Sequence, residues 1–397
     1  LKAGRRDAVN DAAATDPVRA LDAYMDAPDP APGLQAGPVV IVSDSLPERN
    51  GVGAYYWDLL GLLENAGCEA TILCPSEKRP TLLRFPLPGD STQRIWIPSL
   101  FRFRRVMRQY RPKTIIVATP GPYGLLGAWW ARRLGAKLIV GFHTHFSSVT
   151  DVYNNRFLRA FSRFYFNIAD KILFRYGDLV LANSEAMVDL ARSLGARNVG
   201  VMGTLLPGDS LHDPDPPASG KLERIVFAGR LAPEKRVHTV IEAARQLPDI
   251  RFTIAGDGPL RKDVETQAAE IPNLDFLGWV SRERLLAEMD NADMLVLNSV
   301  VESFGTVALE AMARERLALV SRTCGIVEWP ELVDNLYQIG DGESLADAIA
   351  RVAAESPATR AAAARGARKA ALRLNRGSLL HWLDVIRSAE ESSVAAP

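Results

Sequence analysis

The 397-residue chain has only three cysteines, Cys68, Cys74 and Cys324. Three cysteines cannot form a disulfide framework, and their separation does not match the spacing of metal ligands. No basic-then-apolar leader opens the chain, so nothing indicates secretion. Prolines and glycines interrupt the longest uncharged stretch, 114–131, which makes it a poor membrane span. We expect a cytoplasmic protein, free in solution or peripheral at the inner face of the membrane.

The chain also lacks a net charge, because 47 Lys and Arg residues balance 47 Asp and Glu residues. The balance is uneven along the chain: residues 37–206 carry +9 and residues 207–397 carry −7. Acidic residues are absent from 91–150, which holds ten lysines and arginines. Such a basic field favours an anionic partner. Nucleic acid is disfavoured because the acidic second half would be repelled, so an anionic membrane surface is the partner we expect.

Short apolar runs alternate with helical patterns in two series. The strand candidates are 38–43, 70–74, 94–97, 114–118, 137–142, 178–182 and 198–202, then 223–228, 250–255, 273–277, 293–297, 317–321 and 335–339. Strands that are apolar on both faces and alternate with helices indicate parallel sheets covered by helices. We therefore predict an α/β protein with two Rossmann-like doubly wound domains that face each other across a cleft.

The domain boundaries are predicted from composition. A Pro/Gly-rich linker interrupts every periodic pattern between the two series, and the last segment is helical and rich in Ala and Arg. That last segment either caps the second domain or crosses back to the first. The predicted parts are an N-terminal arm and linker at 1–36, a first domain at 37–206, the interdomain linker at 207–221, a second domain at 222–355 and C-terminal helices at 356–397.

The segment 228–235, Ala-Gly-Arg-Leu-Ala-Pro-Glu-Lys, follows a strand candidate and precedes a helical stretch. Arg230 and Lys235 would stand at a strand end, beside a helix N-terminus with free N–H groups. This combination suits a diphosphate, which needs several donors on neighbouring oxygens. The alternative is two solvated loop cations.

The segment 302–310, Glu-Ser-Phe-Gly-Thr-Val-Ala-Leu-Glu, also follows a strand candidate and opens a helix. Gly305 allows close approach of a ligand to the backbone. Glu302 and Glu310 lie about two turns apart and could hold separate hydroxyl-bearing parts of one ligand. The alternative is a pair of acidic residues stabilised by the helix dipole.

A third segment, Gly256-Asp257-Gly258-Pro259, forms a tight turn after a strand and is explained equally well as a plain strand-to-helix turn. In the first domain, Gly51 and Gly53 precede a helical run and could touch a phosphate or a sugar. A dinucleotide fingerprint would require a third small residue where Tyr56 stands.

His143 ends a strand candidate on the cleft side. His145 follows two residues later, and we do not expect the two histidines to share a metal. The G-x-x-x-x-G-K-[ST] phosphate loop, the H-E-x-x-H zinc motif and a nucleophilic serine elbow are all absent from the sequence. We predict neither a metal site nor a cofactor.

Arg230 with Lys235, the Gly-Asp-Gly-Pro turn and the two glutamates, in this order and spacing, resemble the retaining glycosyltransferases of family 4, which have the GT-B fold. The run from Arg104 to Phe146, with its His-Thr segment, resembles the glycolipid-forming branch. The resemblance covers about residues 38–350.

The resemblance implies that Arg230 and Lys235 bind the donor diphosphate and stabilise the leaving group, and that Glu310 holds the ribose. Glu302 would contact the donor sugar, and His143 would face the sugar and the acceptor. The catalytic residues are then Arg230, Lys235, Glu302 and His143. The donor-binding residues are Gly51, Gly53, Gly229, Arg230, Lys235, Gly256, Asp257, Gly258, Glu302, Ser303, Phe304, Gly305, Thr306 and Glu310.

Three features differ from the usual family pattern. The segment Gly203-Thr204-Leu205-Leu206-Pro207-Gly208 stands where a Pro-Asn-Gly-Val-Asp linker signature is usual. Arg236 follows the Glu-Lys pair where glycine is usual, and only Gly325 is kept after the second motif, where two glycines are common.

The implied reaction is transfer of a hexose from a UDP- or GDP-linked sugar, with retention and without a metal. The expected acceptor is a membrane lipid, because arginines alternate with aromatic and aliphatic residues over 101–108 and again at 129–133. The same pattern is explained equally well by a helix with a solvated basic face and buried aromatic residues. The alternatives are a soluble sugar, a sugar phosphate or another small acceptor, and, from another enzyme class, a nicotinamide-dependent oxidoreductase.

Overall fold

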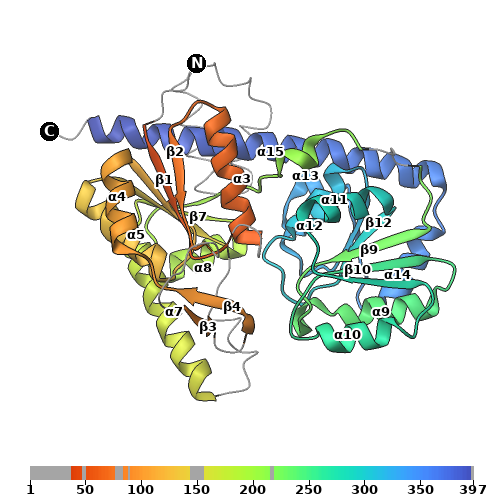
Figure 1. Ribbon diagram of the computed structural model, residues 1–397. Coiled ribbons are helices and arrows are strands. Elements are labelled where there is room, and N and C mark those ends of the chain that lie inside the picture. Colours follow the sequence, from red (N-terminus) through yellow and green to blue (C-terminus); the bar gives the residue numbers. More distant parts are fainter. Residues whose placement is uncertain are drawn as a thin grey trace. The chain divides into compact units, whose positions relative to one another are not determined.

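The protein is described here by a computed structural model, which defines residues 37–46, 51–76, 84–87, 90–143, 156–214 and 219–394 (Figure 1). These residues form two compact units. Unit 1 contains the residues up to Leu205 together with those from Asn375 on, and unit 2 is Leu206–Leu374.

Unit 1 is built on a six-stranded parallel sheet with the strand order β2-β1-β5-β6-β7-β8. The strands β1 and β5 are continuous apolar runs, VVIV and TIIV, because helices cover both faces of the sheet. The strands are β1 (Val39–Val42), β2 (Ala70–Leu73), β5 (Thr114–Val117), β6 (Lys137–Phe142), β7 (Leu179–Ala182) and β8 (Val199–Val201).

A separate antiparallel pair is formed by β3 (Arg84–Leu87) and β4 (Asp90–Trp96). The strand candidate 94–97 therefore overlaps this pair and does not belong to the main sheet.

Helices pack on both faces of the sheet of unit 1. Tyr56 and Leu59 of one helix join Ile41 and Ile116 of the sheet in a buried cluster. On the opposite face, a Cβ at Gly127 would lie 3.1 Å from the side chain of Val42, which shows how closely the helix and the sheet approach. The helices are α3 (Gly51–Asn65), α4 (Leu100–Tyr110), α5 (Pro122–Leu134), α7 (Arg156–Tyr176) and α8 (Glu185–Ser193).

The long helix α15 (Pro357–Val394) contributes to both units, since its residues up to Leu374 belong to unit 2 and the following ones to unit 1. Trp382 is fully buried in unit 1, and its Nε1 donates a hydrogen bond of 2.7 Å to the hydroxyl of Tyr55. The end of the chain is therefore part of the core of the first unit.

Unit 2 repeats the architecture with the strand order β11-β10-β9-β12-β13-β14, again all parallel. The strands are β9 (Arg224–Ala228), β10 (Arg251–Ala255), β11 (Leu274–Gly278), β12 (Met294–Leu297), β13 (Leu317–Val320) and β14 (Tyr337–Gln338). The helices are η3 (Gly208–Leu211), η4 (Pro233–Lys235), α9 (Val237–Gln246), α10 (Arg261–Ala268), α11 (Arg282–Asn291), α12 (Thr306–Ala313), η5 (Gly325–Glu328), α13 (Pro330–Val333) and α14 (Leu345–Ala353).

These topologies confirm the predicted α/β class with two doubly wound parallel sheets. In each sheet the strand order reverses once, between β1 and β5 in unit 1 and between β9 and β12 in unit 2. Ligands of such sheets bind at this switch point, beyond the carboxyl ends of the strands. Among the residues that the structure describes, no helix combines the length and the apolar character needed to cross a bilayer.

Candidate functional site

The loops that follow β9, β10 and β12 are held together at the switch point of unit 2. The backbone N–H of Leu231 donates to the carbonyl of Asp257 at 3.0 Å, which joins the first loop to the third predicted motif. The N–H of Val300 donates to the carbonyl of Glu234 at 2.7 Å, which joins it to the loop after β12. The structure thus brings three sequence motifs from separate strands to one edge of the sheet.

Lys235 and Glu302 form the closest charged contact of this edge, between the Lys235 ammonium and the Glu302 carboxylate. Their side chains are only 17% and 19% exposed. Lys235 ends η4 after β9, whereas Glu302 follows β12, so the pair spans the two strands that flank the switch point. Because the pair is largely shielded from water, the charges interact more strongly than a surface pair would.

Arg230 lies in the same loop as Lys235, and its Nη1 is 3.5 Å from a carboxylate oxygen of Glu234. The two cations predicted from the sequence therefore stand on one short loop, each beside a carboxylate. Gly229, which precedes Arg230, leaves space: a Cβ there would meet one atom, of Phe227, at 3.8 Å.

The turn Gly256-Asp257-Gly258 is needed by the fold itself. A Cβ at Gly256 would lie 1.9 Å from the carbonyl oxygen of Gly229, and one at Gly258 would lie 2.5 Å from that of Leu231. The Asp257 carboxylate accepts a 2.8 Å hydrogen bond from the N–H of Gly258. These three residues position the neighbouring loop that carries the cations.

The segment before α12 places Gly305 at φ 97°, in the left-handed region that favours glycine. Phe304 is buried, and its ring packs edge-on against Trp329 with centroids 5.9 Å apart. Its carbonyl accepts from the N–H of Ile326 at 2.8 Å. The side chain of Phe304 is thus part of the core. The backbone from Ser303 to Thr306 leads into the N-terminus of α12.

Glu310 projects from the second turn of α12, and its Oε1 lies 3.4 Å from Nη2 of Arg282. Its side chain is 12% exposed. Arg282, the first residue of α11, was not predicted from the sequence. Its only sequence signal is Ser281, whose side chain caps α11 by accepting from the N–H of Arg284.

Arg236 stands at a position where the family usually has glycine. Its backbone has φ 48° and ψ 39°, a left-handed conformation in which glycine is favoured. The residue links η4 to α9, so the usual glycine position is conformationally demanding here as well, and this chain places an arginine in it.

In unit 1, His143 follows β6 and is half-buried, with its Nε2 3.0 Å from the hydroxyl of Tyr56. Burial lowers the pKa of His143 to about 3, so the imidazole is neutral at physiological pH. Tyr56 occupies the position where a dinucleotide fingerprint needs a small residue. A Cβ at Gly141 would lie 1.7 Å from the Tyr56 hydroxyl, which therefore occupies the space beside β6.

Gly51 and Gly53 lie in the first turn of α3, which begins at Gly51. From the sequence we expect both glycines before the helix, whereas the structure places them at its N-terminus. Gly51 is exposed, and no atom lies within 4 Å of a Cβ placed there, whereas Gly53 is buried. The preceding residues 47–50 lie outside the described residues.

Asp44 organises the switch point of unit 1 and was missed by the sequence analysis. Its carboxylate accepts hydrogen bonds from the N–H groups of Tyr123 at 2.7 Å and Gly124 at 3.2 Å, at the start of α5. Its other contact is the hydroxyl of Thr119 at 2.8 Å. Burial raises the pKa of Asp44 to about 6 despite these bonds.

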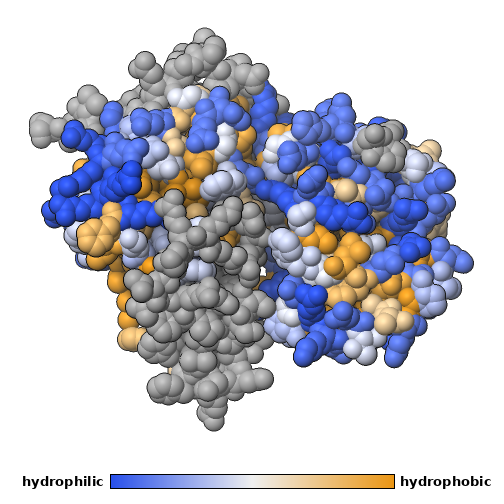
Figure 2. All heavy atoms as spheres, in the orientation of Figure 1, coloured by the Kyte–Doolittle hydropathy of each residue, from blue (hydrophilic) through white to orange (hydrophobic). Residues whose placement is uncertain are grey.

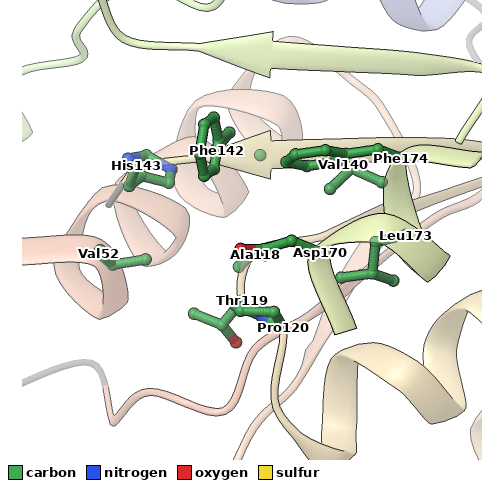
Figure 3. A pocket seen from close by; sticks show the side chains of 11 residues that line it. Val52, Ala118, Thr119, Pro120, Val140, Phe142, His143, Asp170, Leu173 and Phe174 are labelled. Atoms are coloured by element: carbon green, nitrogen blue, oxygen red, sulfur yellow. The ribbon is translucent and has the colours of Figure 1, made fainter. Parts of the chain in front are cut away.

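A cavity of about 10 Å³ lies at this switch point. It is bounded by Val52 of α3, by residues 118–120 after β5, by the end of β6 with His143 and by Asp170 of α7 (Figure 3). This volume holds about one water-sized group. Asp170 was not singled out in the sequence.

Among the described residues, no group of three His, Cys, Asp or Glu side chains is arranged to hold a metal ion. Asp213, in the predicted interdomain linker, pairs with Arg368 at 2.8 Å.

Comparison with known proteins gives matches to two family models. Residues 49–202 match the model described as glycosyltransferase family 4, and residues 211–370 match glycosyl transferases group 1. The two models cover most of both units. The chain belongs to the GT-B glycosyltransferases. This membership decides against the oxidoreductase alternative.

Two curated relatives come from Mycobacterium tuberculosis. The GDP-mannose-dependent α-(1-6)-phosphatidylinositol dimannoside mannosyltransferase of strain ATCC 25177 / H37Ra is 38% identical over 109 residues, 26% of this chain and 28% of that protein. The GDP-mannose-dependent α-mannosyltransferase of strain CDC 1551 / Oshkosh is 27% identical over 69% of this chain and 76% of that protein. The chain spans between 28% and 41% of the length of three of its curated relatives.

A solved structure shows the same fold. HepE from Anabaena, in complex with UDP-glucose, superposes with a TM-score of 0.65 at 18% identity, covering 89% of this chain and 99% of HepE. At this identity the similarity establishes the GT-B fold.

Proposed function

We propose that this protein is a retaining hexosyltransferase that moves a hexose from a nucleotide-diphosphate sugar to a membrane lipid. The observation that carries the proposal is the position of Lys235 and Glu302 in direct contact across the switch point of unit 2, with Arg230 on the same loop. Two cations on a short loop at such an edge match the charge of a diphosphate.

In this proposal Arg230 and Lys235 bind the diphosphate and stabilise the negative charge that develops on its oxygen as the glycosidic bond breaks. Each cation has a carboxylate beside it, Glu234 and Glu302, which keeps it oriented toward the edge of the sheet. Glu302 also faces the donor sugar, so the leaving group and the sugar are held by one charged pair.

Glu310 holds the ribose hydroxyls, and Arg282 orients its carboxylate through the 3.4 Å contact. The open space at Gly229 and the backbone N–H groups around Gly305 give the donor close access to the main chain. On the unit 1 side, Gly51 and Gly53 lie at the N-terminus of α3, and the positive end of a helix dipole attracts a phosphate.

Retention of the anomeric configuration is supported by the weak basicity of His143. His143 is neutral because burial lowers its pKa to about 3, so it is a weak base toward an acceptor hydroxyl. Attack from the same face, with the proton passing to the departing diphosphate oxygen, needs no protein base and no metal.

The donor is a UDP- or GDP-linked hexose. Two relatives are named for GDP-mannose, and HepE was solved with UDP-glucose, so both nucleotides have a precedent in the family.

The lipid acceptor is supported by an exposed face of unit 1 formed by α4, α5 and α7, here called the basic-apolar face. Phe101 is 88% exposed and Phe164 is 66% exposed. Arg132 stacks on the ring of Tyr176 at 4.3 Å, which joins α5 to α7. Figure 2 shows hydrophilic side chains gathered over α4 and α5 and apolar ones beside them along α7. Apolar groups flanked by arginines suit an anionic bilayer.

The proposal is tested by transfer from GDP-mannose and UDP-glucose to vesicles that contain an anionic lipid, with the anomeric configuration of the product read by NMR. A thermal-shift titration with GDP, UDP and the two sugars measures donor binding separately, because a bound donor raises the unfolding temperature. An inverted product would overturn retention. Transfer to a methyl glycoside in solution, with no cosedimentation with anionic vesicles, would replace the lipid by a soluble acceptor.

A further inference from the structure

The cavity at the switch point of unit 1 contains a carboxyl group that the proposed donor site does not use. Asp170 of α7 is 2% exposed. Among the described residues its Oδ2 has no hydrogen-bond partner. Figure 3 shows its carboxyl group directed into the cavity, toward the side where His143 and Val52 lie.

A structural role does not account for this carboxyl group. Of the residues that line the cavity, His143 is the other titratable one, and no Lys or Arg lines it. Burial alone raises the pKa of Asp170 to about 7, because nothing compensates the charged form. A buried carboxyl without a partner weakens the fold, and an apolar residue of similar volume would pack better among Val140, Leu173 and Phe174.

The cavity selects the chemistry of what enters it. Its volume of about 10 Å³ admits one water-sized group, which excludes a phosphate. A phosphate would also meet the Asp170 carboxylate with no cation beside it. A hydroxyl group has the required size and donates a hydrogen bond to a carboxylate, and a bond to a charged group is the stronger kind.

We propose that Asp170 binds a hydroxyl group of the acceptor, on a sugar or polyol headgroup, in the cavity beside His143. This assignment rests on the proposed transferase function. It places the hydroxyl in unit 1, whereas the charged residues proposed for the donor diphosphate lie in unit 2.

The helix that carries Asp170 also contributes to the basic-apolar face. Phe164, Ile168, Ile172 and Tyr176 recur every four residues along α7, and each is exposed. Asp170 is two residues from Ile168 and Ile172, which places it on the opposite side of the helix. The exposed apolar residues of α7 and the carboxylate in the cavity therefore lie on opposite sides of one helix.

The decisive measurement separates the acceptor KM from the donor KM in Asp170→Leu and Asp170→Asn. The donors are GDP-mannose and UDP-glucose, and the acceptor probes are phosphatidylinositol in phosphatidylcholine vesicles and methyl α-mannoside in solution. We expect Asp170→Leu to raise the acceptor KM at least about tenfold, with Asp170→Asn between it and the wild type. The donor KM and the slow hydrolysis of the donor by water should stay within about twofold, because Asp170 is not among the residues proposed to bind the donor.

The matched control is Asp189→Leu on α8, which removes a carboxylate that is 76% exposed and lies outside the cavity lining. Its acceptor KM should equal that of the wild type. An acceptor KM within about twofold of the wild type in Asp170→Leu overturns the assignment while leaving the transferase function intact. If the wild type transfers hexose to neither probe and binds neither donor, the proposed function fails, and the assignment fails with it.

Stability gives a second readout that needs no acceptor. Asp170→Leu should unfold at the same or a higher urea concentration than the wild type at pH 8, because it removes an uncompensated buried charge. A clear decrease, with Asp189→Leu unchanged, would show that the fold itself uses the carboxylate and would overturn the assignment.

Discussion

The hydroxyl of Tyr56, which is fully buried, lies 3.0 Å from Nε2 of His143, which is half-buried. His143 ends β6, whereas Tyr56 comes from α3, so the contact joins two elements at the edge where the cavity lies. The ring of Tyr55 packs edge-on against the same imidazole with centroids 4.9 Å apart. Two neighbouring tyrosines thus fix the orientation of the histidine that is proposed to face the sugar.

Substitution Tyr56→Phe removes this hydrogen bond and leaves a buried imidazole nitrogen unsatisfied. We expect the free energy of unfolding to fall by about 1–3 kcal/mol. We also expect kcat for transfer to fall by about tenfold or more, because the ring loses its orientation. Urea unfolding and initial-rate kinetics measure the two effects. Gly141→Ala, whose Cβ would displace the same hydroxyl, should reproduce both, and normal kinetics in both variants would refute the positioning role.

Lys235→Ala should lower kcat by about 10²- to 10³-fold, because it removes a donor aimed at the leaving group. Glu310→Ala should mainly raise the donor KM, because the ribose contact is made before and during transfer. Circular dichroism should show both variants folded. Lys221→Ala is the control: this lysine is 65% exposed and pairs with Glu223 at 3.8 Å, and its loss should leave transfer unchanged. Full activity in Lys235→Ala would remove it from the site.

Gly51→Ala and Gly61→Ala test whether the N-terminus of α3 approaches a ligand. Both glycines belong to α3, and neither has an atom within 4 Å of an added Cβ. Alanine should therefore stabilise the helix, by about 0.5–1 kcal/mol at the interior Gly61 and by less at Gly51. Transfer should weaken in Gly51→Ala alone. Equal activity of the two variants would place the donor away from this helix end.

Arg236→Gly should raise the free energy of unfolding by up to about 1 kcal/mol, since Arg236 adopts φ 48° and glycine reaches this conformation without steric cost. The same change at Lys262, within α10, should instead lower stability by about 1 kcal/mol. Urea midpoints of the two variants make the comparison. A loss of stability in Arg236→Gly would mean that the arginine side chain outweighs the backbone strain.

The acid side of the stability curve should depend on buried histidines. Burial lowers the pKa of His381 to about 4, so between pH 6.5 and pH 4 the unfolded chain binds a proton that the folded one does not. Stability is therefore lost as the pH falls through this window, by about 2 kcal/mol at pH 5 for this residue. In His381→Leu the loss between pH 7 and pH 5 should be smaller by this amount. His238→Leu, at a histidine that is 47% exposed, should keep the wild-type slope.

Part of the site could be predicted from the sequence because its charged residues and glycines directly follow apolar runs. Arg230 with Lys235, and Glu302 with Gly305, each follow an apolar run, so their place at the carboxyl end of a strand could be predicted. Arg282 could not be found, because it reaches Glu310 only through the packing of α11 beside α12.

Asp44 and Asp170 could not be predicted from the sequence for a similar reason. An aspartate that caps a helix 79 residues away, or one on the buried side of an amphipathic helix, has no local signature. The predicted role of the Gly256-Asp257-Gly258 turn in donor binding stays a prediction, while the structure shows that its glycines are required by the close approach of the neighbouring loop.

The sequence by itself determined the two parallel sheets, since continuous apolar strands alternating with helices can be buried in few other ways. It also determined which strand ends carry charge, because those residues follow the strands directly. Only the tertiary structure decided which charges meet. Lys235 contacts Glu302 because the strand order places β9 next to β12. Among the residues that the structure describes, Oδ2 of Asp170 has no hydrogen-bond partner, because α7 turns it toward a largely apolar cavity. Such contacts depend on distances between segments far apart in the chain, which no local pattern specifies.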